Sequence, residues 1–305
     1  MDFLYLAGGL VCLLFGGEAL VRGASEIARK MAIPPLLIGL TVVGFGTSTP
    51  ELLVSVDAAL RGVPDIALGN IIGSNIGNIL LIVGLSALVW PIRVMGGTLA
   101  RDTGVMMAAA LALVPIFWVG SVGRIGGALL VAALASYLIY AYRNPGPLSA
   151  DEDKTAQRPV WQSVLWVGAG LVALMVGARF LVDGAVNIAR DFGVSEAFIG
   201  LTIVAIGTSL PELATSIIAA LRKQSEIAIG NIVGSNIFNV LGILGVAAII
   251  TPIPVAGRFL TFDLPVMIAA SAVLTALLLG RPVIGRGAGL GLLGAYVVYV
   301  WAAQG

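Results

Sequence analysis

Residues 44–80 of the chain read GFGTSTPELLVSVDAALRGVPDIALGNIIGSNIGNIL, and residues 205–241 read AIGTSLPELATSIIAALRKQSEIAIGNIVGSNIFNVL. The second stretch aligns with the first at a constant offset of 161 residues without a gap, and 22 of the 37 aligned positions are identical. Unrelated segments of such apolar composition would agree at roughly a tenth of their positions. The chain therefore contains an internal duplication, and these two copies decide the fold.

The composition is that of a membrane protein. Of the 305 residues, 59% are hydrophobic and 11% are charged, and the mean hydropathy is +1.04, which is too apolar for a water-soluble domain. We therefore expect an all-α polytopic fold with ten transmembrane helices. Apolar stretches long enough to cross about 30 Å of hydrocarbon lie at about residues 2–27, 34–60, 66–90, 100–119, 124–142, 163–187, 196–221, 227–251, 261–280 and 285–303.

The ten spans divide into two repeats of opposite orientation. Five spans in each repeat is an odd number, so the second repeat (161–305) enters the membrane from the side opposite to the first (1–142). The hydrophilic segment 143–160 between them is expected to be a cytoplasmic linker. With the amino terminus outside, twelve Lys and Arg fall on the cytoplasmic side and four on the other, so both termini are predicted outside. Inverted repeats are typical of secondary transporters.

The residue inventory excludes several classes of chemistry. The chain has no histidine, and Cys12 is its only cysteine. No Ser-His-Asp constellation, zinc motif or internal disulfide can be built from it. A net charge of +1 gives no reason to expect nucleic-acid binding. We expect a protein that is not an enzyme, needs no cofactor and acts as a monomer in the lipid of the cytoplasmic (inner) membrane.

Each copy of the motif carries a glutamate directly after a proline. Pro50 has no N–H and crowds the carbonyl four residues earlier, so the helix is expected to break near Gly46. Inside a bilayer, a broken helix is tolerated where its released carbonyls line a cavity. Positions i, i+1 and i+4 share one helical face. That face carries two hydroxyls and one carboxylate in each copy: Thr47, Ser48 and Glu51 in the first, and Thr208, Ser209 and Glu212 in the second.

The helix that follows each broken helix adds further oxygen atoms. Ser74 and Asn78 are spaced i, i+4, as are Ser235 and Asn239, so each pair shares a face. Glycines in the same helices leave a smooth surface for close helix packing. Oxygen ligands of this kind suit hard cations such as Ca²⁺ and Na⁺. The sequence therefore predicts an oxygen-lined cation site between the two repeats.

Simpler interpretations exist for each of these features. A single buried glutamate could be a neutral acid that hydrogen-bonds two helices, but two symmetric copies favour a functional role. Asn70, Asn75, Asn231 and Asn236 lie off the shared Ser/Asn face and are interpreted as capping or bridging groups.

Charged residues outside the motif have their own alternatives. Glu18 aligns with Arg179, which suggests a structural charge pair between spans 1 and 6. Asp57 could line a vestibule or end a solvated helix. The acidic run 151–153 is interpreted as solvated because three adjacent acids do not form an EF-hand.

The doubled pattern GTSxPE…GNxxGSNxxN resembles the alpha-repeats of the cation/calcium exchanger superfamily, most closely its prokaryotic sodium/calcium exchanger branch. The resemblance implies ten helices, with sites built from helices 2, 3, 7 and 8, and sliding of spans 1 and 6 across them. It implies a central calcium site at Glu51, Glu212, Thr47 and Thr208, with Asn78 and Asn239 as the remaining polar groups. It implies sodium sites at Ser48, Ser74, Ser209, Ser235 and the backbone oxygens of Gly44 and Ala205.

Three functions follow from this resemblance and from the residues. The first is sodium-driven calcium exchange, with calcium and sodium as the transported ions. The second is proton-coupled exchange of calcium or another divalent cation at the same glutamates, and the third is a passive cation channel. Asn78 and Asn239 stand where some relatives carry aspartate, as potassium-dependent exchangers do in the second repeat, so potassium dependence is not expected. Proton/calcium exchangers carry different signatures near their acidic residues, which favours sodium coupling.

Overall fold

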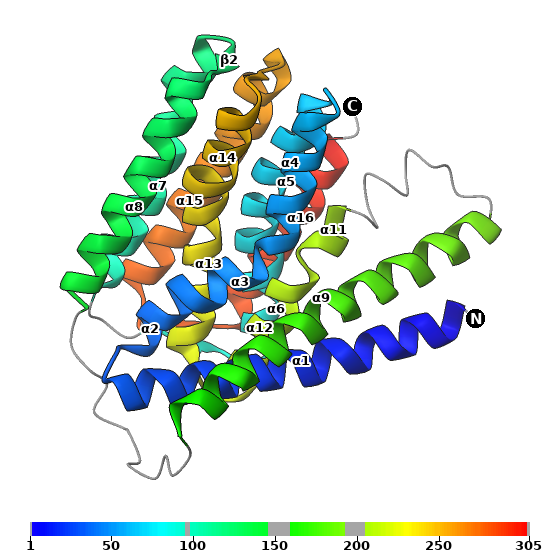
Figure 1. Ribbon diagram of the computed structural model, residues 1–305, viewed down its shortest axis with the longest axis vertical. Coiled ribbons are helices and arrows are strands. Elements are labelled where there is room, and N and C mark those ends of the chain that lie inside the picture. The colour runs from blue at the N-terminus through cyan, green and yellow to red at the C-terminus, as the bar shows by residue number, and fades with distance from the viewer. Residues whose placement is uncertain (1, 95–97, 146–158, 193–204, 304–305) are drawn as a thin grey trace.

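The computed structural model describes residues 2–94, 98–145, 159–192 and 205–303. These residues are almost all helical, as predicted, and form a bundle of steep helices crossed obliquely by one long helix pair (Figure 1). The first half contains α1 (Asp2–Met31), α2 (Pro35–Ile38), the π-helical turn η1 (Gly39–Val43), α3 (Gly44–Thr47), α4 (Thr49–Leu60), α5 (Pro64–Gly77), the π-helical turn η2 (Asn78–Val83), α6 (Gly84–Val89), α7 (Leu99–Trp118) and α8 (Arg124–Arg143).

The described helices of the second half follow a similar order after the interval between α8 and α9. Most of the segment expected to be a linker, 146–158, lies outside the described residues, as does 193–204 at the start of the seventh predicted span. Prolines in the first turns of α2, α4, α5, α12 and α15 preset the backbone there. The second half contains α9 (Val160–Asp191), α11 (Ala205–Thr208), α12 (Leu210–Leu221), α13 (Ser225–Ile237), η4 (Phe238–Ile243), α14 (Leu244–Ile250), η5 (Phe259–Asp263), α15 (Leu264–Gly280) and α16 (Arg286–Ala302).

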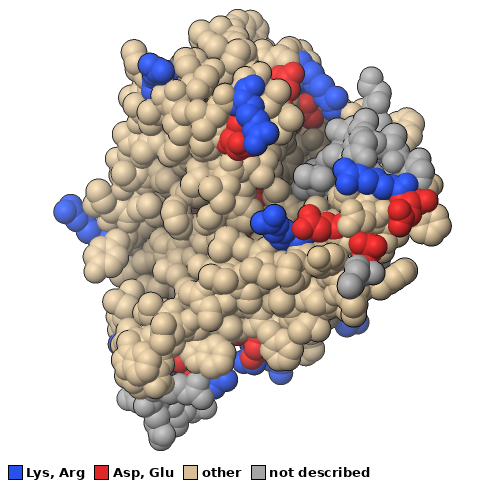
Figure 2. Space-filling model, turned by 45° about the vertical axis from the view of Figure 1, so that its right-hand side comes forward, with Lys and Arg blue, Asp and Glu red and all other residues tan. Residues whose placement is uncertain are grey.

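Seven of the described helices are long and apolar enough to cross a membrane, and the bent pair formed by Pro35–Thr47 and Thr49–Leu60 brings this to eight. The described part of the chain thus supports fewer spans than the ten predicted. Two predicted spans do not meet the length criterion there. Part of the span predicted at 196–221 lies outside the described residues, which leaves the helix Leu210–Leu221, and α16 has 17 residues. The protein is therefore a multi-pass membrane protein. Most of the face in Figure 2 carries no charged side chain.

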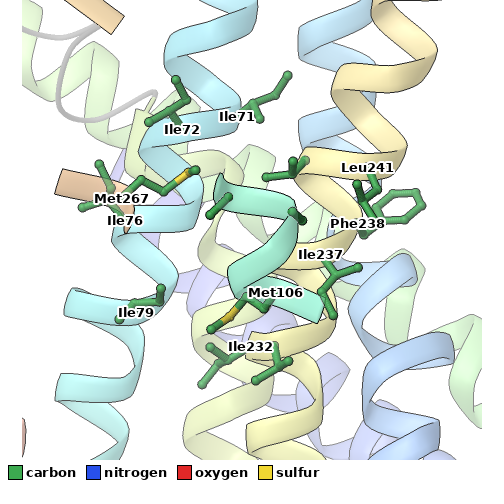
Figure 3. Close-up of a cluster of buried hydrophobic side chains, with 14 of the residues drawn as sticks. Ile71, Ile72, Ile76, Ile79, Met106, Ile232, Ile237, Phe238, Leu241 and Met267 are labelled. Atoms are coloured by element: carbon green, nitrogen blue, oxygen red, sulfur yellow. The ribbon is translucent and has the colours of Figure 1, made fainter. Parts of the chain in front are cut away.

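Two continuous helical segments form the centre of the bundle. The most apolar window is 78% buried in Pro64–Val89 and 83% buried in Ser225–Ile250, compared with 28 to 39% in the other five long spans. Their buried side chains form one large core, which also includes residues of α7 and α15 (Figure 3). Ile71, Ile76, Ile232 and Ile237 are at most 1% exposed. Because the motif helices are central, the polar groups they carry are withdrawn from lipid.

α1 and α9 lie side by side and cross the main bundle (Figure 1). Glycines bring their backbones into contact: a Cβ added to Gly9 would lie 2.8 Å from the carbonyl oxygen of Gly177, and one added to Gly16 would lie 2.9 Å from that of Gly170. Gly9 faces Gly177, and Gly16, further along α1, faces the earlier residue Gly170 of α9. The two helices are therefore antiparallel. Such backbone contact needs residues without side chains.

Four two-residue strands were not predicted. β1 (Ile92–Arg93) pairs with β4 (Val283–Ile284), and β2 (Ser121–Val122) pairs with β3 (Ile253–Pro254), both antiparallel. Each pair joins one half of the chain to the other. These pairs satisfy backbone groups where helices end, which the helical periodicity of the sequence does not reveal.

The glycine contacts predict a position-specific sensitivity. In Gly177→Leu, the new Cβ would lie 2.8 Å from Cys12 Cβ and 2.9 Å from Gly9 O, so α1 and α9 must separate. We expect the free energy of unfolding to fall by about 1–3 kcal/mol or more, seen as a lower midpoint in thermal unfolding of the detergent-solubilised protein. Gly168→Leu on the same helix is the control, because nothing lies within 4 Å of its added Cβ. Equal midpoints for the two variants would contradict this interpretation.

Candidate cation site

The first motif breaks its helix at the predicted place. The helices Pro35–Thr47 and Thr49–Leu60 meet at an angle of 45°, and Ser48 lies between them. Pro50, in the first turn of α4, has no N–H to donate to the carbonyl oxygen of Gly46. The second copy repeats the arrangement, with Ser209 between α11 and α12 and Pro211 in the first turn of α12. Each glutamate therefore lies in the first turn of a new helix.

The two broken helices face each other through reciprocal hydrogen bonds. Ser48 donates its hydroxyl to Oε1 of Glu212 at 2.8 Å, and Ser209 donates to Oε1 of Glu51 at 3.2 Å. Each carboxylate is therefore bound by the serine at the break of the opposite motif. Both glutamates are 1% exposed. The predicted meeting of two acids from different halves is present in the structure.

Four oxygen atoms of the predicted ligand residues are buried without a hydrogen-bond partner. They are Oε2 of Glu51, Oε2 of Glu212, Oδ1 of Asn78 and Oδ1 of Asn239, and all four residues are 1% exposed. Unpartnered buried oxygens are costly, and two of these belong to carboxyl groups. A cation bound among them would satisfy these atoms and offset the charge.

The other predicted residues surround this centre. Ser235 donates to the carbonyl oxygen of Gly44 at 3.3 Å, and Ser209 also lies 3.4 Å from the hydroxyl of Ser74. Thr47 donates to Asn231 at 3.0 Å and Thr208 to Asn70 at 3.3 Å. Ala205 is the first residue of α11. The structure thus brings the predicted hydroxyls and carboxylates of the two motifs together.

The two flanks of the site differ in exposure. Thr47, Ser48 and Asn231 are at most 1% exposed, whereas the equivalent Thr208, Ser209 and Asn70 are only half-buried. The described residues therefore bury the side chains of one flank more fully than those of the other, although the two motifs are similar in sequence.

Some polar residues at the site have roles beyond those the sequence indicated. Asn239 donates to Oδ1 of Asn75 at 3.1 Å, a bond between the two halves, and Asn75 donates to the sulfur of Met267 at 3.4 Å. The π-helical turn η2 begins at Asn78, and η4 includes Asn239. Such turns are often found at functional sites, but no residue pattern in the sequence marked them.

The predicted pairing of Glu18 with Arg179 is wrong. Glu18 forms an ion pair with Arg222 at the end of α12, and Arg179 lies 3.8 Å from Asp183 on its own helix. The antiparallel register explains the difference. Because Gly16 contacts Gly170, Glu18 lies far along α1 from the point opposite Arg179.

The later helices of each half contain a buried acid that the sequence analysis missed. Asp102 is 0% exposed and accepts hydrogen bonds from Arg101 at 2.6 Å and Tyr137 at 3.0 Å. Asp263, 161 residues later, accepts from Tyr299 at 3.1 Å. The shared offset of the two aspartates was the available signal. Because each acid has partners, these clusters join helices and do not resemble the unsatisfied cation site.

The candidate site combines few charged ligands with many neutral oxygen atoms. Among the described residues, no three acidic or cysteine side chains gather as metal ligands, and the chain has no histidine. The centre offers two carboxylates together with hydroxyl, amide and carbonyl oxygens. Affinity for a hard cation rises with the number of charged ligands. The centre therefore has fewer charged ligands than a site for tight calcium binding.

Comparison with known proteins identifies the family of the chain. A family model described as "Sodium/calcium exchanger protein" matches residues 1–143 and 162–304. The chain belongs to the sodium/calcium exchanger family. Members of this family are transporters and not enzymes, and their substrates are Na⁺ and Ca²⁺.

Relatives of this exchanger match along most of their length. The chain is 41% identical to the putative antiporter CaxA of Alkalimonas amylolytica, over 89% of this chain and 88% of that protein. It is 38% identical to the inner membrane protein YrbG of Escherichia coli K12, over 96% and 93%. The solved sodium-calcium exchanger NCX_Mj, soaked with zero Na⁺ and Ca²⁺, matches with a TM-score of 0.88 and 33% identity over 99% and 98% of the two chains.

The unsatisfied oxygens predict that calcium stabilises the folded exchanger. At a calcium concentration of about 100 times its Kd, the free energy of unfolding should rise by about 2.7 kcal/mol. Glu51→Gln and Glu212→Gln should each remove this stabilisation, because an amide carries no charge. Thermal unfolding in calcium and in chelator measures it. Glu26→Gln is the control, since Glu26 is also buried but is bound by Ser163 at 2.9 Å. If calcium raised the unfolding midpoint of Glu51→Gln as much as that of the wild type, the Glu51 carboxylate would have a structural role and would not bind calcium.

Proposed function

We propose that this protein is a secondary antiporter that exchanges sodium for calcium across the cytoplasmic membrane by alternating access. The observation that carries the proposal is the reciprocal binding of two buried glutamates by serines of opposite motifs, beside four unpartnered oxygens. The family match supports the choice of ions, and the match to an inner membrane protein supports the location.

The proposed architecture has ten transmembrane helices in two inverted repeats, 1–142 and 161–305, joined by a cytoplasmic linker, with both termini outside. The antiparallel packing of α1 against α9 supports inversion, because these helices occupy equivalent positions in the two repeats. The strand pairs, each with one strand from either half, have the same symmetry.

In the proposed site, calcium binds between Glu51 and Glu212, with Thr47, Thr208, Asn78 and Asn239 around it. Sodium binds at the flanking oxygens, namely Ser48, Ser74, Ser209, Ser235 and the carbonyls of Gly44 and Ala205. The hydrogen bond from Ser235 to the Gly44 carbonyl supports one flank. The contact between Ser209 and Ser74 supports the other.

Obligatory exchange follows from the charge of the two glutamates. Together they supply about −2, which balances one calcium ion or two sodium ions. Without a cation, two facing carboxylates in a low-dielectric interior repel each other and have lost their hydration. The change between the two orientations therefore costs much more free energy when the carrier is empty. Each reorientation then requires bound ions. Unequal exposure of the two flanks is what a carrier open to one side would have.

Coupling to protons is the second candidate, because the same buried carboxyls could carry protons in place of sodium. The many hydroxyl and amide oxygens near the glutamates favour metal ions, since protonated acids need far fewer ligands. Sodium dependence of calcium flux separates the two functions.

Transport in proteoliposomes tests the proposed function. With sodium inside, pH equal and buffered on both sides, and the membrane potential clamped, calcium uptake should require the outward sodium gradient. Replacing internal sodium by choline should abolish it. Uptake that follows a pH gradient and ignores sodium would support proton coupling, and uptake without any internal counter-ion would support a channel.

Variants connect this flux to the site. Glu51→Gln and Glu212→Gln should each reduce sodium-driven calcium uptake to the level of empty liposomes, because the cavity would lose half of its charge. Asp65→Asn, an exposed acid in the first turn of α5, should transport normally. Near-normal uptake by either glutamine variant, at equal amounts of folded protein, would contradict the assignment of the site.

A further inference from the structure

Two asparagines behind the cation site hold repeated positions and make equivalent contacts. Asn70 on α5 and Asn231 on α13 are 161 residues apart. Asn231 donates to the hydroxyl of Ser216 at 3.0 Å and to the carbonyl oxygen of Glu212 at 3.4 Å. Asn70 donates to the hydroxyl of Ser55 and to the carbonyl oxygen of Glu51. Each amide therefore holds the helix turn that carries the glutamate of its own half.

These contacts fix the direction in which each side-chain amide points. A backbone carbonyl can only accept a hydrogen bond, so the NH₂ group must face it. The amide oxygen of Asn231 consequently faces Thr47 at 3.0 Å, and that of Asn70 faces Thr208 at 3.3 Å. A flipped amide would bring two acceptors together at the glutamate turn.

The amide oxygens in turn orient the threonine hydroxyls. Asn231 Oδ1 has no proton, so the 3.0 Å contact is a hydrogen bond only when the Thr47 hydroxyl donates its single proton to it. Thr47 Oγ1 also lies 3.1 Å from the carbonyl of Val43, another acceptor. Its proton is thus directed to the protein, and its lone pairs remain for other partners. A hydroxyl binds a cation only through such lone pairs.

We infer that Asn70 and Asn231 are positioning residues: each orients the ion-binding threonine of the opposite repeat and couples it to the glutamate turn of its own repeat. This inference rests on the proposed function, because it concerns how the proposed ligands are held. Thr47 comes from the first half, and the turn of Glu212 from the second. Ordering of one turn by an ion would therefore also order the threonine of the other half.

A role of the asparagines as direct ligands fits the contacts less well. Both N–H bonds of each amide are used, and the oxygen already accepts from threonine. Asn78 and Asn239 differ, because their oxygens are buried and unpartnered. The two pairs of asparagines therefore differ: Asn70 and Asn231 hold ligand residues, whereas Asn78 and Asn239 have a free side-chain oxygen.

A double-mutant cycle tests the inference. In sodium-driven calcium uptake, Asn231→Leu and Thr47→Val should each raise the apparent KM for calcium by about tenfold, the size expected for a lost buried hydrogen bond. If Asn231 acts through Thr47, the double variant should also show a rise of about tenfold. Two independent residues would instead give about a hundredfold rise. Asn70→Leu with Thr208→Val forms the equivalent cycle on the half-buried flank.

Matched controls separate positioning from a loss of structure. Asn144→Ala, at an exposed helix end, should leave the KM unchanged. Asn231 and Thr208 are not hydrogen-bond partners in this scheme, so in the double variant Asn231→Leu with Thr208→Val the two increases in KM should multiply. The inference would be overturned if the KM of the single variants stayed within about twofold of wild type. It would also be overturned if the increases in KM multiplied in the double variants of hydrogen-bonded partners. If Asn231→Leu does not fold, the Asn70 cycle decides. Wild-type protein without sodium-driven uptake would instead overturn the proposed function.

Discussion

The structure depends on keeping two carboxyl groups, Glu51 and Glu212, together inside a protein that is otherwise apolar. Each is bound by a serine from the other motif, so neither half can form its site alone. The surrounding features serve this constraint: prolines open the helices at Ser48 and Ser209, and central helices keep the acids from lipid. The buried oxygens that lack a hydrogen-bond partner could be satisfied by a bound cation.

Much of this arrangement could be predicted because the motif occurs twice in the sequence. The broken helix at Ser48, the face shared by hydroxyl and carboxylate, and the bridging character of Asn70 and Asn231 followed from residue type and helical spacing. Such properties are local, since a proline acts on its own turn and a face repeats every third or fourth residue. The duplication then indicated that both copies serve one site.

Features that depend on register between distant helices could not be predicted in the same way. Glu18 and Arg179 align in sequence, but equivalent positions in antiparallel helices lie opposite each other only near the symmetry axis. Glu18 therefore pairs with Arg222. The buried acids Asp102 and Asp263 were missed because their tyrosine partners lie at unequal offsets, and each cluster forms only when two helices pack.

The ion pair between Glu18 and Arg222 has a consequence for the balance between the halves. The residues related to this pair by the duplication are Arg179 and Arg61, two cations. An exchange of roles between the repeats would replace an attraction by a repulsion. Two end states related by the pseudo-symmetry would then differ in free energy, and the resting population would be biased. In a carrier whose two end states are related by this pseudo-symmetry, the pair would favour one end state only slightly, because both side chains are exposed.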